Sequence, residues 1–325
     1  MRIVQSGQLM ETLMIQLRSR NLLSIDDFSS EELSLILAAA ARLKRQPADV
    51  AQLAVGKTLA MIFEKPSLRT RVTFEVAMTQ MGGHAIYLAP SDIGLGSREP
   101  VKDVARNLSR WCDAIMARTF SHQTVQGLAD FATIPVVNAL SDREHPCQAL
   151  ADFQALRERK GEVAGRKLCY VGDGNNVAAS LALLAAKLGT HFSLACPPGY
   201  ELAPEILARA QEIAAGTGAH IAMGHDPHAM VRDADAVYTD VWTSMGQEQE
   251  QAERLRVFPP YQVNAALLRD AKPDAVVMHC LPAHRGEEIT DEVLEGPQSI
   301  VLDEAENRLH AQKAVLALAF GWMPA

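Results

Sequence analysis

Short apolar runs alternate with longer amphipathic segments along most of this chain. Runs of four to six residues, such as TLAMIF (58–63) and KLCYV (167–171), have the length of strands buried on both faces. Further strands are expected at 84–88, 113–118, 134–138, 191–195, 220–223, 236–239, 275–279 and 299–302. Because helical patterns separate most of these runs, the sequence predicts parallel sheets covered by helices on both faces, which is an α/β fold.

Helices are predicted where apolar residues recur at a period near ~3.6. Ser29 and Glu32 form a capping box, S-x-x-E, and apolar residues at helical spacing follow over 33–43. The segment 101–111 shows the same period, and a further helix is expected over 69–81.

A chain of 325 residues is longer than a single hydrophobic core usually supports, so two domains are expected. A boundary near residue 150 is predicted, because the helix after HPCQALADF runs through the charged stretch RERKGEVAGRK before a new strand begins. The expected fold is therefore two doubly wound parallel-sheet domains linked by helices. With 48% hydrophobic and 22% charged residues, the composition excludes disordered and fibrous proteins.

Charge and cysteine content restrict the class of protein further. The 31 basic and 39 acidic residues give a net charge of −8, which lacks the broad basic surface of a nucleic-acid-binding protein. The five cysteines are scattered and never form a C-x-x-C pair, so free thiols and a cytoplasmic location are expected. No apolar run approaches the about 20 residues of a membrane span. Residues 1–20 are expected to be an extension without an assigned function.

Seven polar clusters follow predicted strands, at the edge where parallel sheets bind ligands. They are EKPSLRTR, ART, ALSDREHPCQ, GDGNN, DVWTSMG, HCLPAHRG and DEAENR. Candidate binding and catalytic residues are therefore expected in these clusters.

The cluster EKPSLRTR is interpreted as a phosphate site. Pro66 ends the strand, and Ser67 can cap a helix whose first turn contains Arg69, Thr70 and Arg71. That turn presents backbone N–H groups and the positive end of the helix dipole. Cations are normally favoured in the last turn, so two arginines here indicate an anion; a capped helix with solvated arginines is the alternative.

Two further clusters offer polar groups to a small substrate. In HPCQ, His145 could donate to a carbonyl oxygen and Gln148 could pair its amide with a planar NH2-bearing group, although a histidine near a helix start is more often structural. In DVWTSMG, Asp240 and Ser244 could bind an ammonium and a second polar group, or simply cap a turn.

Two clusters raise alternatives that the sequence disfavours. GDGNNVA resembles a dinucleotide-binding loop, but an NAD site needs an acidic residue about 20 positions later, where the chain reads LACPP. HCLPAHRG contains a thiol and two histidines, but their spacing gives no obvious four-ligand zinc set. A nucleophilic pair of Cys280 and His279 is also disfavoured, because neighbouring strand residues point to opposite faces.

Together these loops resemble those of the aspartate/ornithine carbamoyltransferase family, and most closely its ornithine branch. EKPSLRTR resembles the family's carbamoyl-phosphate signature, HPCQ its second signature, and DVWTSMG with HCLPAHRGEE its ornithine-type loops. The resemblance extends from about Leu22 to the C-terminal helix. The aspartate branch is less similar, because it has H-P-L-P in place of HCLP and lacks the SMG loop.

The resemblance implies transfer of a carbamoyl group from carbamoyl phosphate to the δ-amine of L-ornithine, giving L-citrulline and phosphate in arginine metabolism. It implies a carbamoyl-phosphate-binding domain over 1–150, completed by a C-terminal helix at 305–325, and an ornithine-binding domain over 151–304. It also implies a homotrimer with active sites between neighbouring subunits, no cofactor and no metal. Aspartate, putrescine or an N-acylated ornithine are alternative acceptors, and a non-catalytic metabolite-binding relative is a further alternative.

The resemblance also implies the site residues. The carbamoyl-phosphate ligands would be Ser67, Leu68, Arg69, Thr70, Arg118, His145, Gln148, Cys280, Leu281 and Arg308. The catalytic residues among them would be Arg69, Arg118, His145 and Cys280. The L-ornithine ligands would be Asn176, Asp240, Ser244 and Met245. Direct amine attack through a tetrahedral intermediate is expected, without a covalent enzyme species.

Two positions depart from the family's pattern. Leu68 stands where the signature usually has threonine, which removes a hydroxyl but leaves the backbone N–H. Gly94 lies where many relatives have a glutamine that reaches a neighbouring subunit's carbamoyl phosphate. No cross-subunit contact is therefore assigned.

Overall fold

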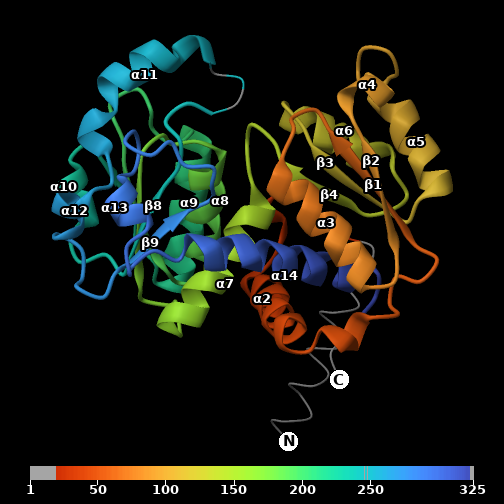
Figure 1. Ribbon diagram of the computed structural model, residues 1–325, viewed down its shortest axis with the longest axis horizontal. Coiled ribbons are helices and arrows are strands. Elements are labelled where there is room, and N and C mark those ends of the chain that lie inside the picture. The colour runs from red at the N-terminus through yellow and green to blue at the C-terminus, as the bar shows by residue number, and fades with distance from the viewer. Residues whose placement is uncertain (1–19, 245, 247, 323–325) are drawn as a thin grey trace, which may run out of the picture. The chain divides into compact units, whose positions relative to one another are not determined.

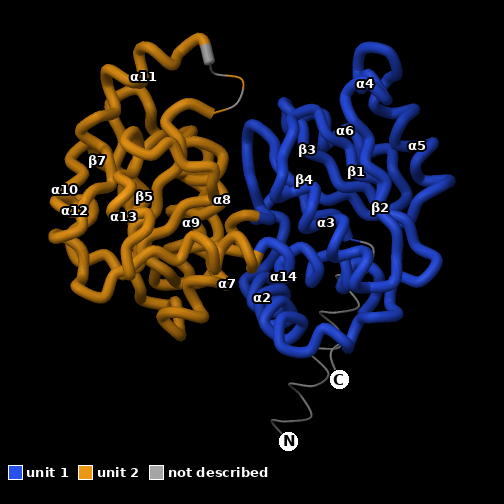
Figure 2. The backbone as a smooth tube through the Cα atoms, in the orientation of Figure 1, with its two compact units in different colours: residues 1–147, 308–325 blue, residues 148–307 orange. Residues whose placement is uncertain are grey.

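The computed structural model describes residues 20–244, 246 and 248–322 (Figure 1). The chain divides into two compact units: unit 1 contains residues 1–147 and 308–325, and unit 2 contains residues 148–307 (Figure 2). No helix within the described ranges is both long and apolar enough to cross a membrane.

Unit 1 is built on a four-stranded parallel sheet with the strand order β2-β1-β3-β4. Its strands are β1 (Thr58–Phe63), β2 (His84–Leu88), β3 (Ala114–Arg118) and β4 (Val136–Leu140). The helices that begin in this unit are α2 (Ser30–Arg45), α3 (Leu68–Gln80), α4 (Pro90–Ile93), α5 (Val101–Trp111), α6 (His122–Phe131) and α7 (Pro146–Lys160). Apolar side chains of α5 and α6 pack against β1 and β3 in a buried core. This packing fixes the strand ends that carry polar clusters.

Unit 2 is built on a five-stranded parallel sheet with the order β7-β6-β5-β8-β9. Its strands are β5 (Lys167–Val171), β6 (His191–Ala195), β7 (Ile221–Gly224), β8 (Ala236–Thr239) and β9 (Val276–His279). Its helices are α8 (Asn176–Lys187), α9 (Pro204–Thr217), α10 (Pro227–Val231), α11 (Gln251–Val257), α12 (Ala265–Leu268) and α13 (Asp291–Leu294), followed by α14 (Val301–Ala319). The units are joined by helices, because residues 147–148 lie in α7 and residues 307–308 lie in α14.

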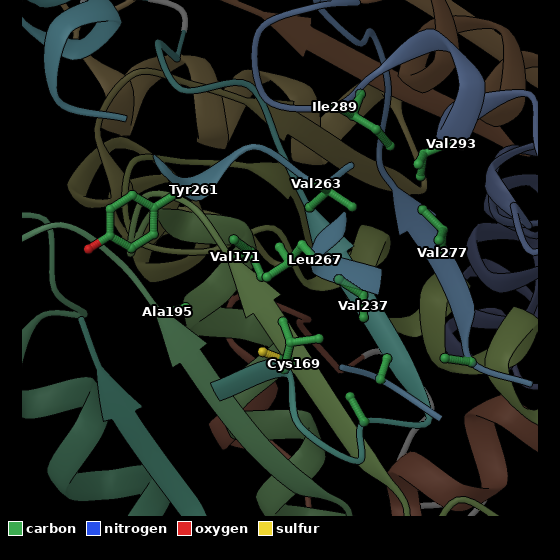
Figure 3. Close-up of a cluster of buried hydrophobic side chains, with 14 of the residues drawn as sticks. Cys169, Val171, Ala195, Val237, Tyr261, Val263, Leu267, Val277, Ile289 and Val293 are labelled. Carbon is green, nitrogen blue, oxygen red and sulfur yellow. The ribbon is translucent and has the colours of Figure 1, made fainter. Parts of the chain in front are cut away.

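The core of unit 2 packs one face of this sheet against α12 and α13. Figure 3 shows Val171 of β5, Val237 of β8 and Val277 of β9 beside Leu267 and Val293. These residues are nearly or fully inaccessible to solvent. Strands β5, β6, β8 and β9 contribute apolar side chains to this core, so the polar residues that follow them are held at the carboxyl edge of the sheet.

The predicted α/β class with two parallel sheets is confirmed, and so is the capping box at the start of α2. Ser29 Oγ accepts from the Glu32 N–H at 3.2 Å, and Glu32 Oε2 accepts from the Ser29 N–H at 2.7 Å. These reciprocal bonds satisfy donors that a helix start otherwise leaves without an intrahelical partner.

The strand expected at 299–302 is wrong. Ser299 forms only an isolated bridge with Val277, and α14 begins at Val301. The Ile300 N–H donates to the Val277 carbonyl, but the Ile300 carbonyl accepts from the Glu304 N–H and starts a helix. Four apolar residues suit a short strand or the first turn of a buried helix equally well, so their pattern could not separate the two.

The loop GDGNN requires glycine at its third position because another segment passes very close. A Cβ built on Gly174 would lie 2.4 Å from the backbone of Glu201 and Leu202. A backbone cannot move aside as a flexible side chain can. Gly216, inside α9, has nothing within 4 Å of the same built position.

We therefore predict opposite effects for two glycine-to-alanine changes. Gly174→Ala should lower the free energy of unfolding by about 2 kcal/mol or more through overpacking. Gly216→Ala should leave it unchanged or raise it by up to about 1 kcal/mol, because alanine is the better helix former. Urea unfolding followed by circular dichroism measures both, and equal stabilities of the two variants would contradict the close approach at Gly174.

Candidate active site

The first turn of α3 follows β1 and is organised by Ser67. Its hydroxyl accepts from the Thr70 N–H at 3.3 Å and donates to Thr70 Oγ1 at 3.1 Å. The turn contains no acidic residue. Its N–H groups and dipole therefore favour a bound anion.

The two arginines of this turn have different surroundings. Arg71 Nε donates to Glu75 Oε1 at 2.9 Å, and its guanidinium lies 4.0 Å from the centre of the Tyr87 ring. The charge of Arg69 instead acts on the buried His145. Of these two arginines, Arg69 is therefore the one whose charge reaches the buried part of unit 1, whereas Arg71 is held by surface contacts.

Arg308, on α14, meets the same turn. It is almost fully buried, and its Nη2 donates to Thr70 Oγ1 at 3.0 Å. With the Gln312 carboxamide oriented to donate to Thr73 Oγ1 at 2.6 Å, its oxygen accepts from Arg308 Nε at 3.1 Å and Nη2 at 3.0 Å. Sequence reasoning missed Gln312, although its position one helical turn after Arg308 was a usable signal.

His145 lies in a buried, positively charged environment within unit 1. Burial and the charges of Arg308, Arg118 and Arg69 hold the pKa of His145 well below its ordinary value. The imidazole is therefore neutral at neutral pH and can donate one hydrogen bond without adding charge. Burial also raises the pKa of the neighbouring Cys147 to about 12, so that thiol stays protonated.

In unit 2, Asp240 follows β8 and is nearly buried. Its Oδ2 accepts from Asn175 Nδ2 at 3.0 Å, and its Oδ1 accepts from Cys280 Sγ at 3.0 Å. Asn175 also caps α8, because its Oδ1 accepts from the Val177 and Ala178 N–H groups. Sequence reasoning named Asn176 and missed Asn175 as the residue that contacts Asp240.

The loop after β9 is shaped by a fully buried histidine and carboxylate pair. The Leu281 N–H donates to His279 Nδ1 at 2.9 Å, so the other ring nitrogen, Nε2, carries the proton and donates to Glu288 Oε1 at 3.0 Å. Possible ligand atoms of Asp240, His279 and Cys280 lie within 4.8 Å of one another, as in a metal site. The hydrogen bonds described here account for that grouping.

The acid in the GDGNN loop also has a structural partner. Asp173 Oδ2 accepts from Arg254 Nη1 at 2.6 Å, and the same Nη1 donates to the Trp242 carbonyl at 2.7 Å. Arg254 thereby connects this loop to the segment that follows Asp240. This ion pair gives Asp173 a role that needs no dinucleotide.

The structure distributes the predicted residues over the two units. Unit 1 contains Ser67, Leu68, Arg69, Thr70, Arg118, His145 and Arg308; unit 2 contains Gln148, Asn176, Asp240, Ser244, Cys280 and Leu281. Met245 lies outside the described residues. The side chain of Leu68 is 74% exposed.

Comparison with known proteins decides the family. The carbamoyl-phosphate-binding domain of aspartate/ornithine carbamoyltransferases matches residues 20–158, and their aspartate/ornithine-binding domain matches residues 164–319. This chain belongs to the aspartate/ornithine carbamoyltransferase family. The predicted family is thereby confirmed.

Curated carbamoyltransferases and solved structures agree with this membership. The ornithine carbamoyltransferase of Pyrococcus abyssi is 53% identical over 311 residues, covering 95% of this chain and 98% of that protein. The ornithine carbamoyltransferase of Pyrococcus furiosus named anabolic is also 53% identical over 311 residues, covering 95% of this chain and 99% of that protein.

Two solved carbamoyltransferases share the fold. The Pyrococcus furiosus structure has a TM-score of 0.92 at 53% identity and covers 95% of this chain and 99% of its own. The structure from Gloeobacter violaceus has a TM-score of 0.85 at 51% identity and covers 93% of this chain and 99% of its own.

The depressed pKa of His145 predicts a pH dependence of stability in this carbamoyltransferase. An unfolded histidine takes up a proton as the pH falls through about 6.5, but native His145 does not, so acid favours unfolding. His145→Gln should therefore lose less free energy of unfolding between pH 7.5 and pH 5 than the wild type. Urea titrations at both pH values measure this difference.

The exposed His220 provides the matched control. His220→Gln should retain the wild-type loss of stability on acidification. The same loss in all three proteins would show that His145 is not held neutral.

Proposed function

We propose that this chain transfers the carbamoyl group of carbamoyl phosphate to the δ-amine of L-ornithine, giving L-citrulline and phosphate. The observation that carries this proposal is that the charges of Arg69, Arg118 and Arg308 all act on the buried His145. Relatives named ornithine carbamoyltransferase that align over nearly the whole chain support the same reaction.

Carbamoyl phosphate matches the polar groups of unit 1. We propose that its dianionic phosphate binds Ser67, Leu68 through its backbone N–H, Arg69 and Thr70 at the start of α3. This turn combines a cation with backbone donors, which suits a phosphate oxygen. Arg308 would extend the charge from α14, since it already donates to Thr70 Oγ1.

The carbamoyl group would be activated by donors around its oxygen. We propose that Arg118, Thr70 and His145 donate to this oxygen as negative charge develops in a tetrahedral intermediate. A neutral His145 suits this role, because its proton stabilises the oxyanion without adding to the three nearby guanidinium charges. Gln148, Cys280 and Leu281 would complete the carbamoyl site.

L-Ornithine matches the acidic groups of unit 2. We propose that Asp240 anchors the α-ammonium, with Asn176, Ser244 and Met245 holding the rest of the amino acid. The δ-amine must attack in its neutral form, although an alkyl ammonium has a pKa near ~10. The Cys280 thiol donates to Asp240, which favours a binding role over a nucleophilic one and direct attack over a covalent enzyme intermediate.

The wider organisation follows from the same reaction. We propose that unit 1 is the carbamoyl-phosphate-binding domain and unit 2 the ornithine-binding domain, and that the reaction serves arginine biosynthesis.

We further propose a homotrimer, which would cover the exposed apolar side chains of Leu68, Val72 and Ile86 on α3 and β2. The five cysteines, all among the described residues, form no disulfide, which supports a cytoplasmic location.

The two arginines of α3 provide the test of the anion site. Arg69→Ala should lower kcat/KM for carbamoyl phosphate by about 100-fold or more, because it removes a charged donor from the reacting group. Arg71→Ala should stay within about threefold of the wild type, because Arg71 contacts only surface groups in the interactions described for it. Citrulline formation measures both, and similar losses in the two variants would contradict the assignment.

The acceptor assignment has its own test. Asp240→Asn should raise KM for L-ornithine about 10- to 100-fold, because it removes the charge that meets the ammonium together with one of the two acceptors for Asn175 and Cys280. KM for carbamoyl phosphate should change less than about threefold. Asp274→Asn, at an exposed site in unit 2, is the control. Faster turnover with aspartate, putrescine or N-acetylornithine than with L-ornithine would refute the acceptor but not the carbamoyl donor.

A further inference from the structure

A buried polar network in unit 2 lies beside one predicted carbamoyl ligand. Asp152 on α7, Tyr238 on β8 and Glu304 on α14 are fully buried. Asp152 Oδ1 accepts from Gln148 Nε2 at 2.7 Å, and Asp152 Oδ2 accepts from the Tyr238 hydroxyl at 3.1 Å. Glu304 lies close enough to Asp152 for a hydrogen bond between the two carboxyl groups once one of them is protonated, and Glu304 Oε2 accepts from the His279 N–H at 3.1 Å.

Two carboxyl groups in contact must share a proton. Among the residues that the structure describes, none donates to the buried Oε1 of Glu304. A hydrogen bond between the two carboxyl groups requires a proton on one of them, and Oε1 of Glu304, which receives no donor from these residues, is the oxygen available to carry it. Burial and the charge of Asp152 raise the pKa of Glu304 well above its ordinary value, in agreement with a neutral acid.

The position of this proton determines the state of Asp152. Three donors then point at Asp152: the Gln148 amide, the Tyr238 hydroxyl and the Glu304 acid. An ionised carboxylate has acceptor sites for all three and no proton to donate. The single negative charge of the network therefore lies on Asp152.

This charge fixes the orientation of the Gln148 carboxamide. Only the NH2 end of an amide can bond to an ionised carboxylate, so Nε2 faces Asp152 and Oε1 is directed away from it. A flipped amide would place oxygen against carboxylate oxygen. The Gln148 oxygen can accept a hydrogen bond from the NH2 of a carbamoyl group. Acetyl phosphate has a methyl group in place of this NH2 and can donate no hydrogen bond to the oxygen.

We propose that Asp152 is a positioning residue that holds the Gln148 oxygen toward the carbamoyl NH2 and thereby selects carbamoyl phosphate over acetyl phosphate. This inference rests on the proposed function, because it assigns Gln148 to the carbamoyl site. Glu304 supplies the proton that allows Asp152 to remain ionised. Its Oε2 also holds the His279 N–H, so the same acid connects the start of α7 with the end of β9.

Two mirrored variants test this assignment of charge. Asp152→Asn creates a group that can donate as well as accept, so the Gln148 amide loses its fixed orientation. Its kcat/KM for carbamoyl phosphate should fall about 10- to 100-fold, and KM for L-ornithine should change less than about threefold. Glu304→Gln keeps a neutral donor toward Asp152 and an acceptor for His279, and should stay within about threefold of the wild type.

The ratio of the dissociation constants of carbamoyl phosphate and acetyl phosphate, measured by calorimetry, separates positioning from stability. The preference for carbamoyl phosphate should fall about tenfold or more in Asp152→Asn and persist in Glu304→Gln. Tyr238→Phe removes one donor but keeps the carboxylate, so it should lose stability and retain the preference. If Asp152→Asn does not fold, Glu304→Gln still tests the assignment of charge. The opposite assignment, an ionised Glu304 beside a protonated Asp152, predicts that Glu304→Gln loses the preference for carbamoyl phosphate.

Three results would overturn the proposal: the reverse ranking of Asp152→Asn and Glu304→Gln, an unchanged preference in Asp152→Asn, or no preference in the wild type. The proposed function is tested separately by turnover. If the wild type carbamoylates no amine, that function fails, but the ratio of dissociation constants still tests Asp152.

Discussion

The concentration of positive charge around His145 is the constraint on which the candidate site depends. Three guanidinium groups act on one buried imidazole, and all three oppose its protonation. They come from α3, the end of β3 and α14, so both the sheet and the C-terminal helix must form before the cluster exists. Repulsion among the three guanidinium groups is lowest when an anion lies between them. Binding of an anion should therefore raise the free energy of unfolding of unit 1.

Unit 2 contains buried carboxyl groups instead of a cluster of arginines, and each of them is stabilised in a different way. Asp240 accepts from a thiol and a carboxamide, and Asp173 is paired with Arg254. Glu304 avoids a second charge beside Asp152 by retaining its proton. Each of these carboxyl groups therefore has hydrogen-bond or ion-pair partners inside unit 2.

The features of the fold that depend on local sequence pattern could be predicted from the sequence. Apolar runs located the strands, S-x-x-E located the start of α2, and the polar clusters located the strand ends. Residues 299–302 were misread, because a short apolar run does not distinguish a strand from a helix start. The different roles of Arg69 and Arg71 and the contact of Asn175 with Asp240 depend on which segments meet in three dimensions, and sequence spacing does not give this.

The most direct test of the central claim is the free energy of unfolding as a function of inorganic phosphate concentration, with sodium chloride at equal ionic strength as the reference. The charge cluster predicts that phosphate, a dianion without the carbamoyl group, stabilises the protein by about 1.4 kcal/mol for each tenfold increase above its dissociation constant. Equal stability in phosphate and chloride at every concentration would contradict an anion site built around His145.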